Sequence, residues 1–185
     1  VPAWKIGSGE VTNTPFLERV AKTKKPVLLS SGMSSWAELD AAVDMVTKSG
    51  APLAVFQCTT SYPCPAEKVG LNVVGELRAR YPSTPVGLSD HSATIYPCLG
   101  ARALGATLFE VHVCFSKEQF GPDTKASLTI DELAQLVDGV RFLDKTLAAP
   151  VDKDAAAEGM SELKRIFGKS VVAARDLAAG ALLGE

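Results

Sequence analysis

The sequence predicts an α/β protein whose strands form a parallel sheet of the (β/α)8-barrel (TIM-barrel) type. Short apolar runs without polar alternation, typical of strands buried on both faces, alternate with longer amphipathic segments. Polar residues follow nearly every apolar run, as expected where barrel strands converge on one mouth. We trace five consecutive βα units in this way.

The predicted strands are the apolar runs themselves. Each is short, rich in Val, Leu, Ile or Phe, and bounded by polar residues or proline. They cover residues 4–7, 26–30, 53–58, 86–88 and 107–113.

The predicted helices lie between these runs. One begins at Thr14 with proline at its first turn, and another follows a capping box of Ser35 and Glu38. A second capping box, Thr129 and Glu132, opens the fifth helix. The remaining two cover about residues 71–81 and 95–104.

The polar residues at the strand ends favour a barrel over an open, doubly wound sheet. In an open sheet these residues would spread along an edge, and only the point where strand order reverses would hold a ligand. In a barrel they all face one mouth. They are Lys5, Ser8, Glu10, Ser30, Ser31, Thr59, Thr60, Ser89, Asp90, His91, Glu110 and His112.

The length of the chain indicates part of a barrel. A whole barrel needs roughly 250 residues and eight βα units, whereas this chain has 185 residues. It begins at Val1 without an initiator Met, so we expect a piece of a longer protein. We divide it into residues 1–147, the C-terminal part of the barrel; residues 148–168, a linker with a short helix near 158–167; and residues 169–185, the start of another domain, opening with a strand at 170–173.

The composition is that of an ordinary globular protein. Hydrophobic residues make up 46% of the chain, and the formal net charge is −2. We therefore expect no nucleic-acid or membrane partner and a cytoplasmic location. The four cysteines lack zinc-type spacing, and we expect them to be reduced: Cys58, Cys64, Cys98 and Cys114.

The only two histidines occupy equivalent places on neighbouring predicted strands. His91 follows one apolar run, and His112 lies near the end of the next. Two such imidazoles, with carboxylates nearby, suit a divalent cation; two histidines hydrogen-bonded in a core are the alternative. The flanking carboxylates are Asp90, Glu110 and Asp123.

Lys5 lies between Trp4 and Ile6 inside an apolar run. An inward lysine is costly unless it meets an anion, so three roles are open: Schiff-base nucleophile, phosphate clamp or a strand-end residue reaching solvent. The hydroxyls of Ser8, Ser30 and Ser89 on other strands favour the clamp.

Read in order, these strand ends resemble the sialic acid synthase (N-acetylneuraminate synthase) family. The matching segments are KIGSGEVTN at 5–13, LLSSGM at 28–33, QCTTSYPCP at 57–65, VGLSDHSAT at 86–94, LFEVHV at 108–113 and FGPDTKASL at 120–128. The tail FGKSVVAARDLAAG resembles the start of that family's antifreeze-like (SAF) domain. The resemblance implies that the chain carries barrel strands four to eight.

The resemblance implies an enzyme that condenses phosphoenolpyruvate with an N-acylated amino-sugar aldehyde, giving a nonulosonic (sialic) acid and phosphate. The sugar would be N-acetylmannosamine or a bacillosamine-type relative, and the family works as a homodimer. His91 and His112 would hold a divalent metal, typically Mn²⁺. Phosphoenolpyruvate would be held by Lys5, Ser8, Ser30 and Ser89, and the sugar and catalytic region would be lined by Glu10, Thr60, Tyr62, Glu110 and Asp123, with Glu10 as the base.

The chain departs from the family pattern at two positions. Val111 stands where many members have Lys, and Thr60 stands where Asn is frequent. Both changes leave the details of substrate contact open. Because the first strands and most of the SAF domain are missing, we expect these residues alone to be inactive. A Schiff-base aldolase using Lys5 and a non-catalytic barrel remnant are the two alternative functions.

Overall fold

Six strands form one parallel sheet, and they follow one another in chain order from β1 to β6. The structure, a computed structural model, describes residues 1–182. The sheet and the helices packed on it form a unit that ends at Ala148. The strands are β1 (Trp4–Ile6), β2 (Val27–Ser30), β3 (Leu53–Cys58), β4 (Val86–Asp90), β5 (Leu108–Cys114) and β6 (Ser127–Thr129).

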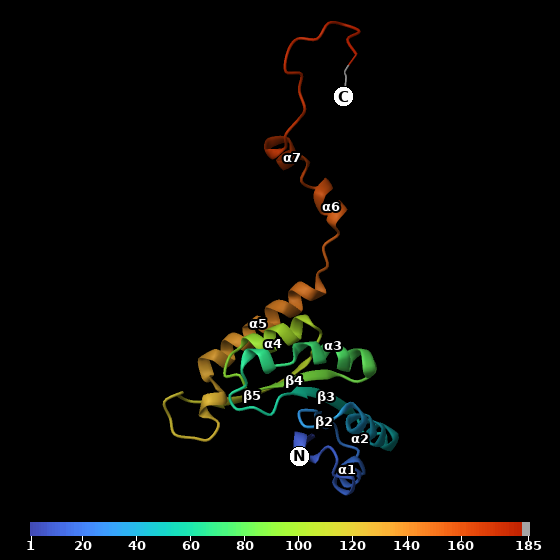
Figure 1. The fold of residues 1–185 in the computed structure, drawn as a ribbon, viewed down its shortest axis with the longest axis vertical. Coiled ribbons are helices and arrows are strands. Elements are labelled where there is room, and N and C mark those ends of the chain that lie inside the picture. The colour runs from blue at the N-terminus through green and yellow to red at the C-terminus, as the bar shows by residue number, and fades with distance from the viewer. Residues whose placement is uncertain (183–185) are drawn as a thin grey trace. The chain divides into compact units, whose positions relative to one another are not determined.

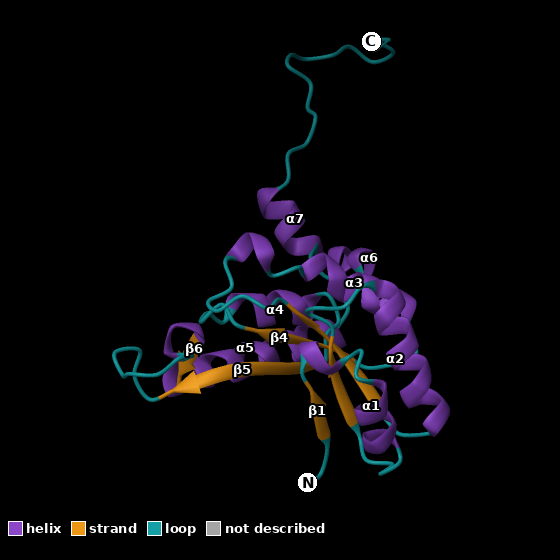
Figure 2. Cartoon of the chain, turned by 60° about the horizontal axis from the view of Figure 1, so that its bottom comes forward, coloured by secondary structure: helices purple, strands orange, loops and turns teal. Residues whose placement is uncertain are grey.

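Helices connect the strands and lie along one face of the curled sheet (Figures 1 and 2). They are α1 (Thr14–Ala21), α2 (Trp36–Ser49), α3 (Leu71–Arg80), α4 (Tyr96–Ala103) and α5 (Ile130–Ala148). Three short 3-10 turns lie in the connections: η1 (Ser8–Glu10), η2 (Ala66–Lys68) and η3 (Thr124–Ala126).

The strand order decides between the two sheets that the sequence allowed. A doubly wound sheet reverses its order at a switch point, whereas neighbours in this sheet are always consecutive in the chain. Sequential parallel order is that of a (β/α)8 barrel, of which the described residues form a curled, six-stranded part. The parallel α/β class and the barrel-type order are therefore confirmed.

The register gives the sheet two chemically different faces. Ile6 pairs with Leu29 and Leu29 with Val55, and these three side chains belong to the core between sheet and helices. Cys58 pairs with Ser89, and Ser89 pairs with Glu110, on the opposite face. Because side chains alternate along a strand, each strand contributes both to the core and to the interior of the curl.

Gly87 allows the interior of the curl to be filled by an aromatic ring. A Cβ atom at this position would lie 2.6 Å from Phe56 Cε1 and 2.7 Å from the Leu108 carbonyl oxygen. Only glycine leaves room for both neighbours, since contacts this short force something to move. Phe56 is buried in consequence, with 2% of its surface exposed.

Both predicted capping boxes are present. Ser35 caps α2 and Glu38 returns a hydrogen bond to the Ser35 backbone, while Thr129 and Glu132 make the same reciprocal pair at α5. Such caps satisfy backbone N–H groups that the first turn of a helix leaves free. Local chemistry therefore fixes where these two helices begin.

Three predictions about the elements are wrong. A sixth strand, β6, was missed, because Ser127, Leu128 and Thr129 hold a single apolar residue between two polar ones. Residues 1–182 thus carry six strands, not the five expected as barrel strands four to eight. The helix predicted near 158–167 corresponds to α7 (Ser161–Phe167), but a further helix, α6 (Lys153–Glu158), was missed; Gly159 and Met160 separate the two.

The third error concerns the C-terminal tail. The strand predicted at residues 170–173 is absent, and residues 168–182 contain no strand in the described part of the chain. A strand needs a partner to pair its backbone groups, and those residues lie in a second unit that begins at Ala149 and whose other elements are α6 and α7.

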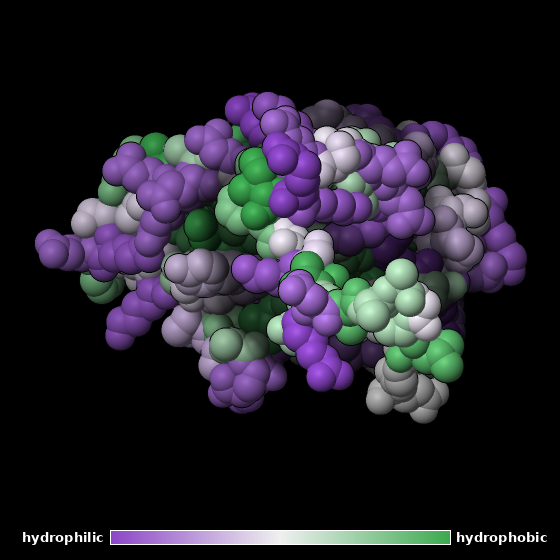
Figure 3. All heavy atoms as spheres, turned by 90° about the horizontal axis from the view of Figure 1, so that it is seen from above, coloured by the Kyte–Doolittle hydropathy of each residue, from purple (hydrophilic) through white to green (hydrophobic). Residues whose placement is uncertain are grey.

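Hydrophilic side chains cover most of the face drawn in Figure 3, with hydrophobic groups set between them. Among residues 1–182, no helix combines the length and the apolar character that crossing a membrane requires.

Candidate functional site

A charged network joins residues of four strands inside the curl. The Lys5 ammonium on β1 donates to Ser30 Oγ on β2 at 2.8 Å and pairs with Glu110 Oε2 on β5 at 3.1 Å. Ser89 on β4 donates to the other carboxylate oxygen of Glu110 at 3.3 Å. Four predicted site residues are thereby brought together. Lys5 also lies over the Phe56 ring, 5.8 Å from its centroid.

The two imidazoles lie beside each other and under Tyr62. The ring centroids of His91 and His112 are 5.0 Å apart, with their planes tilted by 51°. The Tyr62 ring packs 4.2 Å from that of His91 and 5.8 Å from that of His112. The structure therefore places these three predicted residues together, as the resemblance required.

His91 is held in a neutral state. Burial, and then repulsion from His112, lowers the pKa of His91 from its ordinary 6.5 to about 4. Its Nδ1 atom is buried and has no hydrogen-bond partner among residues 1–182. A neutral imidazole keeps the lone pair of one ring nitrogen, which is able to bind a cation. Burial also raises the pKa of the neighbouring Tyr62, which keeps its hydroxyl protonated.

The two remaining predicted carboxylates, Asp123 and Asp90, have different partners. Asp123 Oδ2 lies 3.9 Å from His112 Nδ1, and its side chain is 53% exposed. Asp90 pairs in register with Val111, which packs against the helix-side core. Its carboxylate accepts hydrogen bonds from the Ser92 hydroxyl and backbone. Asp90 thus shapes the loop after β4, and burial raises its pKa.

Ser8 and Thr60 lie around the backbone of Gly32. Gly32 N–H donates to Ser8 Oγ at 3.1 Å, and a Cβ on Gly32 would lie 3.0 Å from Thr60 Oγ1. Glu10, on η1, is exposed and accepts a hydrogen bond from Asn13 Nδ2 at 2.7 Å. No hydrogen bond in the described part of the chain joins Glu10 to Lys5 or to either imidazole.

Sequence reasoning missed Cys58 and Gly32 as members of this site. Cys58 Sγ lies 3.6 Å from His91 Nε2, and Gly32 supplies the N–H that Ser8 accepts. Strand alternation was the available signal for Cys58, because every second residue of a strand faces the same side and Phe56 also points into the curl. Gly32 carried no such signal.

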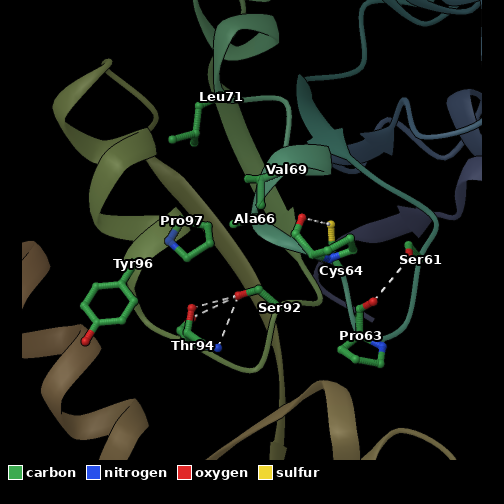
Figure 4. A pocket seen from close by; sticks show the side chains of 11 residues that line it. Ser61, Pro63, Cys64, Ala66, Val69, Leu71, Ser92, Thr94, Tyr96 and Pro97 are labelled. Carbon is green, nitrogen blue, oxygen red and sulfur yellow. Dashed lines mark hydrogen bonds between the residues drawn. The ribbon is translucent and has the colours of Figure 1, made fainter.

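A cavity lies beside the loops that follow β3 and β4 (Figure 4). It has a volume of about 770 Å³. Its lining has no charged side chain. The cavity is lined by Ser61, Pro63, Cys64, Pro65, Ala66, Val69, Leu71, Ser92, Thr94, Tyr96 and Pro97.

Among residues 1–182, no group of three or more His, Cys, Asp and Glu side chains is arranged to hold a metal ion. His91 and His112 therefore form a pair of donors among these residues and not a complete ligand set.

Residues 1–152 match the family model described as the NeuB family. The chain is 36% identical over 185 residues to the N,N'-diacetyllegionaminic acid synthase of Campylobacter jejuni, covering 98% of this chain and 54% of that protein. It is 37% identical over 183 residues to the human N-acetylneuraminate-9-phosphate synthase, covering 99% and 50%. The chain thus spans about half the length of the curated relatives it matches.

A solved structure gives the same result. The N-acetylneuraminic acid (sialic acid) synthetase from Leptospira borgpetersenii, in complex with citrate, superposes with a TM-score of 0.81 at 30% identity. The match covers 92% of this chain and 60% of that one.

Proposed function

Because the chain belongs to the NeuB family, we propose that its protein condenses phosphoenolpyruvate with the open-chain aldehyde of an N-acylated amino sugar. The products are a nonulosonic (sialic) acid and inorganic phosphate, and the sugar is N-acetylmannosamine or a bacillosamine-type relative. The observation that carries the proposal is the convergence of the Lys5 network and the two imidazoles inside one curl. The similarity to synthases of legionaminic acid and N-acetylneuraminate 9-phosphate supports it.

Lys5 and the serines would hold phosphoenolpyruvate. Lys5 pairs with Glu110. Phosphoenolpyruvate offers a phosphate and a carboxylate that can replace this partner and accept from Ser30 and Ser89. Charge-assisted donors aimed at the phosphate would also stabilise the negative charge that leaves with it.

His91 and His112 would hold a divalent cation, for which we propose Mn²⁺ from the family resemblance. The fit rests on the two adjacent imidazoles and on the lowered pKa of His91, which leaves that ring neutral with one nitrogen lone pair. Such an ion, when bound, acts as a Lewis acid on the sugar aldehyde. Asp123, 3.9 Å from His112, would orient that imidazole.

The remaining chemistry needs a base and the loss of phosphate. C3 of phosphoenolpyruvate attacks the aldehyde carbon, which forms the C–C bond and leaves an oxocarbenium ion at C2. Water adds to C2 and passes one proton to a carboxylate, while the alkoxide on the former aldehyde carbon takes up a proton. The C2–O bond to phosphate then breaks as the new C2 hydroxyl gives its proton to the departing phosphate, which leaves the keto acid and inorganic phosphate. We assign Glu10 as the base, while Glu110, Thr60 and Tyr62 line the sugar side. Asn13 donates to Oε2 of Glu10, so Oε1 is the oxygen that would accept the proton.

The test is turnover by the protein expressed from its complete reading frame. Phosphoenolpyruvate, Mn²⁺ and N-acetylmannosamine, or a 2,4-diacetamido sugar, should release one phosphate per molecule of nonulosonic acid, detected by mass spectrometry. Phosphate release without a sugar-derived acid would contradict the proposal. The absence of all turnover, with no bound cation, would favour a non-catalytic remnant.

The same preparation separates the proposal from a Schiff-base aldolase. Lys5 already donates to Ser30 and pairs with Glu110, whereas a Schiff base needs an unpaired, neutral amine. Borohydride reduction with a keto substrate should therefore leave no covalent adduct on Lys5. An adduct there would overturn the assignment.

Four finer points remain proposals. They are an SAF domain beginning near residue 169, a homodimer, a cytoplasmic location, and the inactivity of these residues alone. A comparison of mass in solution and phosphate release between this chain and the complete protein tests the dimer and the inactivity. A dimeric, active complete protein and a chain without turnover is the expected result.

A further inference from the structure

The proposed reaction makes no use of the Cys58 thiol, although it lies inside the site. Cys58 ends β3, is 7% exposed and forms no disulfide. Its register partner is Ser89, which contacts Glu110, so the thiol faces the interior of the curl. Its sulfur lies 3.6 Å from His91 Nε2.

This separation is that of two donors bound to one tetrahedral ion. Metal–sulfur and metal–nitrogen bonds of about 2.3 Å and 2.05 Å at a tetrahedral angle place sulfur and nitrogen about 3.6 Å apart. Without an ion, the same two atoms make a hydrogen bond through a single proton. The pair therefore needs little rearrangement to bind a cation.

The imidazole provides a second, independent observation. His91 is 4% exposed, and within residues 1–182 its Nδ1 has no hydrogen-bond partner. No described protein group therefore forces the ring proton onto Nε2. The nitrogen that faces Cys58 can present its lone pair to an ion while Nδ1 carries the proton.

We propose that Cys58 and His91 form a donor pair for thiophilic divalent cations such as Zn²⁺ and Cd²⁺. Thiolate sulfur favours these ions, whereas oxygen ligands and water suit Mn²⁺. Cys58 thus determines which ion the proposed cation site prefers. On binding, the thiol proton passes to solvent as the metal–sulfur bond forms, and no electron is transferred. The inference deepens the proposed function at its cation site, but its test does not use turnover.

The experiment titrates the whole chain with Cd²⁺, in the absence of added thiols, and records the ultraviolet thiolate-to-cadmium charge-transfer band. We expect the band to saturate at one equivalent in the wild type. Cys58→Ser should abolish it and weaken Cd²⁺ binding by about 10- to 100-fold or more, since loss of even an outer-shell partner costs that much. Cys98→Ala is the matched control, because Cys98 is a fully buried free thiol of α4 in the helix-side core.

Two outcomes would overturn the inference: wild type without the band, or a band that survives in Cys58→Ser. ¹¹³Cd NMR of the wild type supports or contradicts it without any variant, because a sulfur ligand shifts the cadmium resonance far from that of oxygen and nitrogen sites. His91→Asn should lower Cd²⁺ affinity while keeping the thiol. Failure of the proposed function would appear as absent turnover with the band intact, so the two failures are distinguishable.

Discussion

Lys5 Nζ lies 3.1 Å from Glu110 Oε2, although β2, β3 and β4 lie between their strands, β1 and β5, in the sheet. Neighbouring strands are about 4.8 Å apart, so a flat sheet would put β1 and β5 about 19 Å from each other. Two side chains do not bridge that distance. The ion pair therefore requires the sheet to curl, and it places a cation and a carboxylate at the centre of the curl.

Replacing Lys5 by Met should remove most of the activity of the complete protein. The variant loses the ammonium that would bind the phosphoenolpyruvate phosphate, and we expect kcat/KM to fall by about 10²- to 10³-fold, as for other preorganised electrostatic donors. Phosphate release under steady-state conditions measures this. Lys48→Met is the control, since Lys48 is an exposed α2 residue paired with Asp44. An equal loss of kcat/KM in both variants would show that Lys5 has no specific part in binding phosphoenolpyruvate.

Replacing His112 by Asn should weaken Mn²⁺ binding. The variant loses one of the two imidazoles that would hold the ion, and we expect the dissociation constant to rise by more than about 10-fold. Electron paramagnetic resonance of free Mn²⁺ measures the change. Asp44→Asn, which alters an exposed carboxylate of α2, should leave the affinity unchanged. An unaltered Mn²⁺ affinity in His112→Asn would place the ion elsewhere.

The metal-free protein should lose stability as pH falls from about 6.5 to about 4. The pKa of His91 is lowered from 6.5 to about 4, chiefly by burial. Between these two pH values His91 is protonated in the unfolded chain but not in the folded chain. The free energy of unfolding therefore decreases as the pH falls and levels off below about pH 4. Urea unfolding with a chelator present measures the effect.

His91→Gln should flatten this part of the pH profile. Asp40 acts in a lower window, because hydrogen bonds from Arg80 and Tyr81 lower its pKa from 3.8 to about 2. Its contribution is present above pH 4 and is lost towards pH 2. If the free energy of unfolding still falls between pH 6.5 and 4 in His91→Gln, the pH dependence belongs to a group other than His91.

Replacing Gly87 by Ala should destabilise the fold. The new methyl group would lie within 2.7 Å of both the Phe56 ring and the Leu108 carbonyl oxygen, and overpacking of this kind costs about 1–3 kcal/mol. Gly75→Ala, on an open position of α3 with nothing within 4 Å, should instead stabilise by about 0.5–1 kcal/mol. Thermal unfolding compares the two. Equal changes of the melting temperature in the two variants would mean that the Phe56 ring does not pack against Gly87.

The elements were predictable where local chemistry defines them. The capping boxes at Ser35 and Thr129 and the unbroken apolar runs place helices and strands within a few residues of their observed bounds. The strand β6 was missed because its pairing with β5, not its own composition, makes it a strand. The strand expected at 170–173 did not form, because a run of apolar residues needs a neighbouring strand to pair with.

The site was predictable as a set of residues but not as a set of contacts. Strand-end position suggested that Lys5, Ser30, Ser89 and the histidines would meet. It gave no sign that Glu110 pairs with Lys5 or that Cys58 reaches His91, because these contacts depend on the curvature of the sheet and on side-chain alternation within β3. The exposure of Glu10 likewise depends on the η1 turn that carries it.

The most direct test of the site is whether phosphoenolpyruvate and the cation bind side by side. Bound Mn²⁺ broadens the ³¹P resonance of a phosphate that lies within a few bond lengths, so the linewidth of phosphoenolpyruvate reports their proximity. With the complete protein we expect strong broadening that His91→Asn abolishes and that Lys5→Met reduces by weakening phosphoenolpyruvate binding. Phosphoenolpyruvate that binds without broadening, or broadening that both variants retain, would contradict a shared site at the centre of the curl.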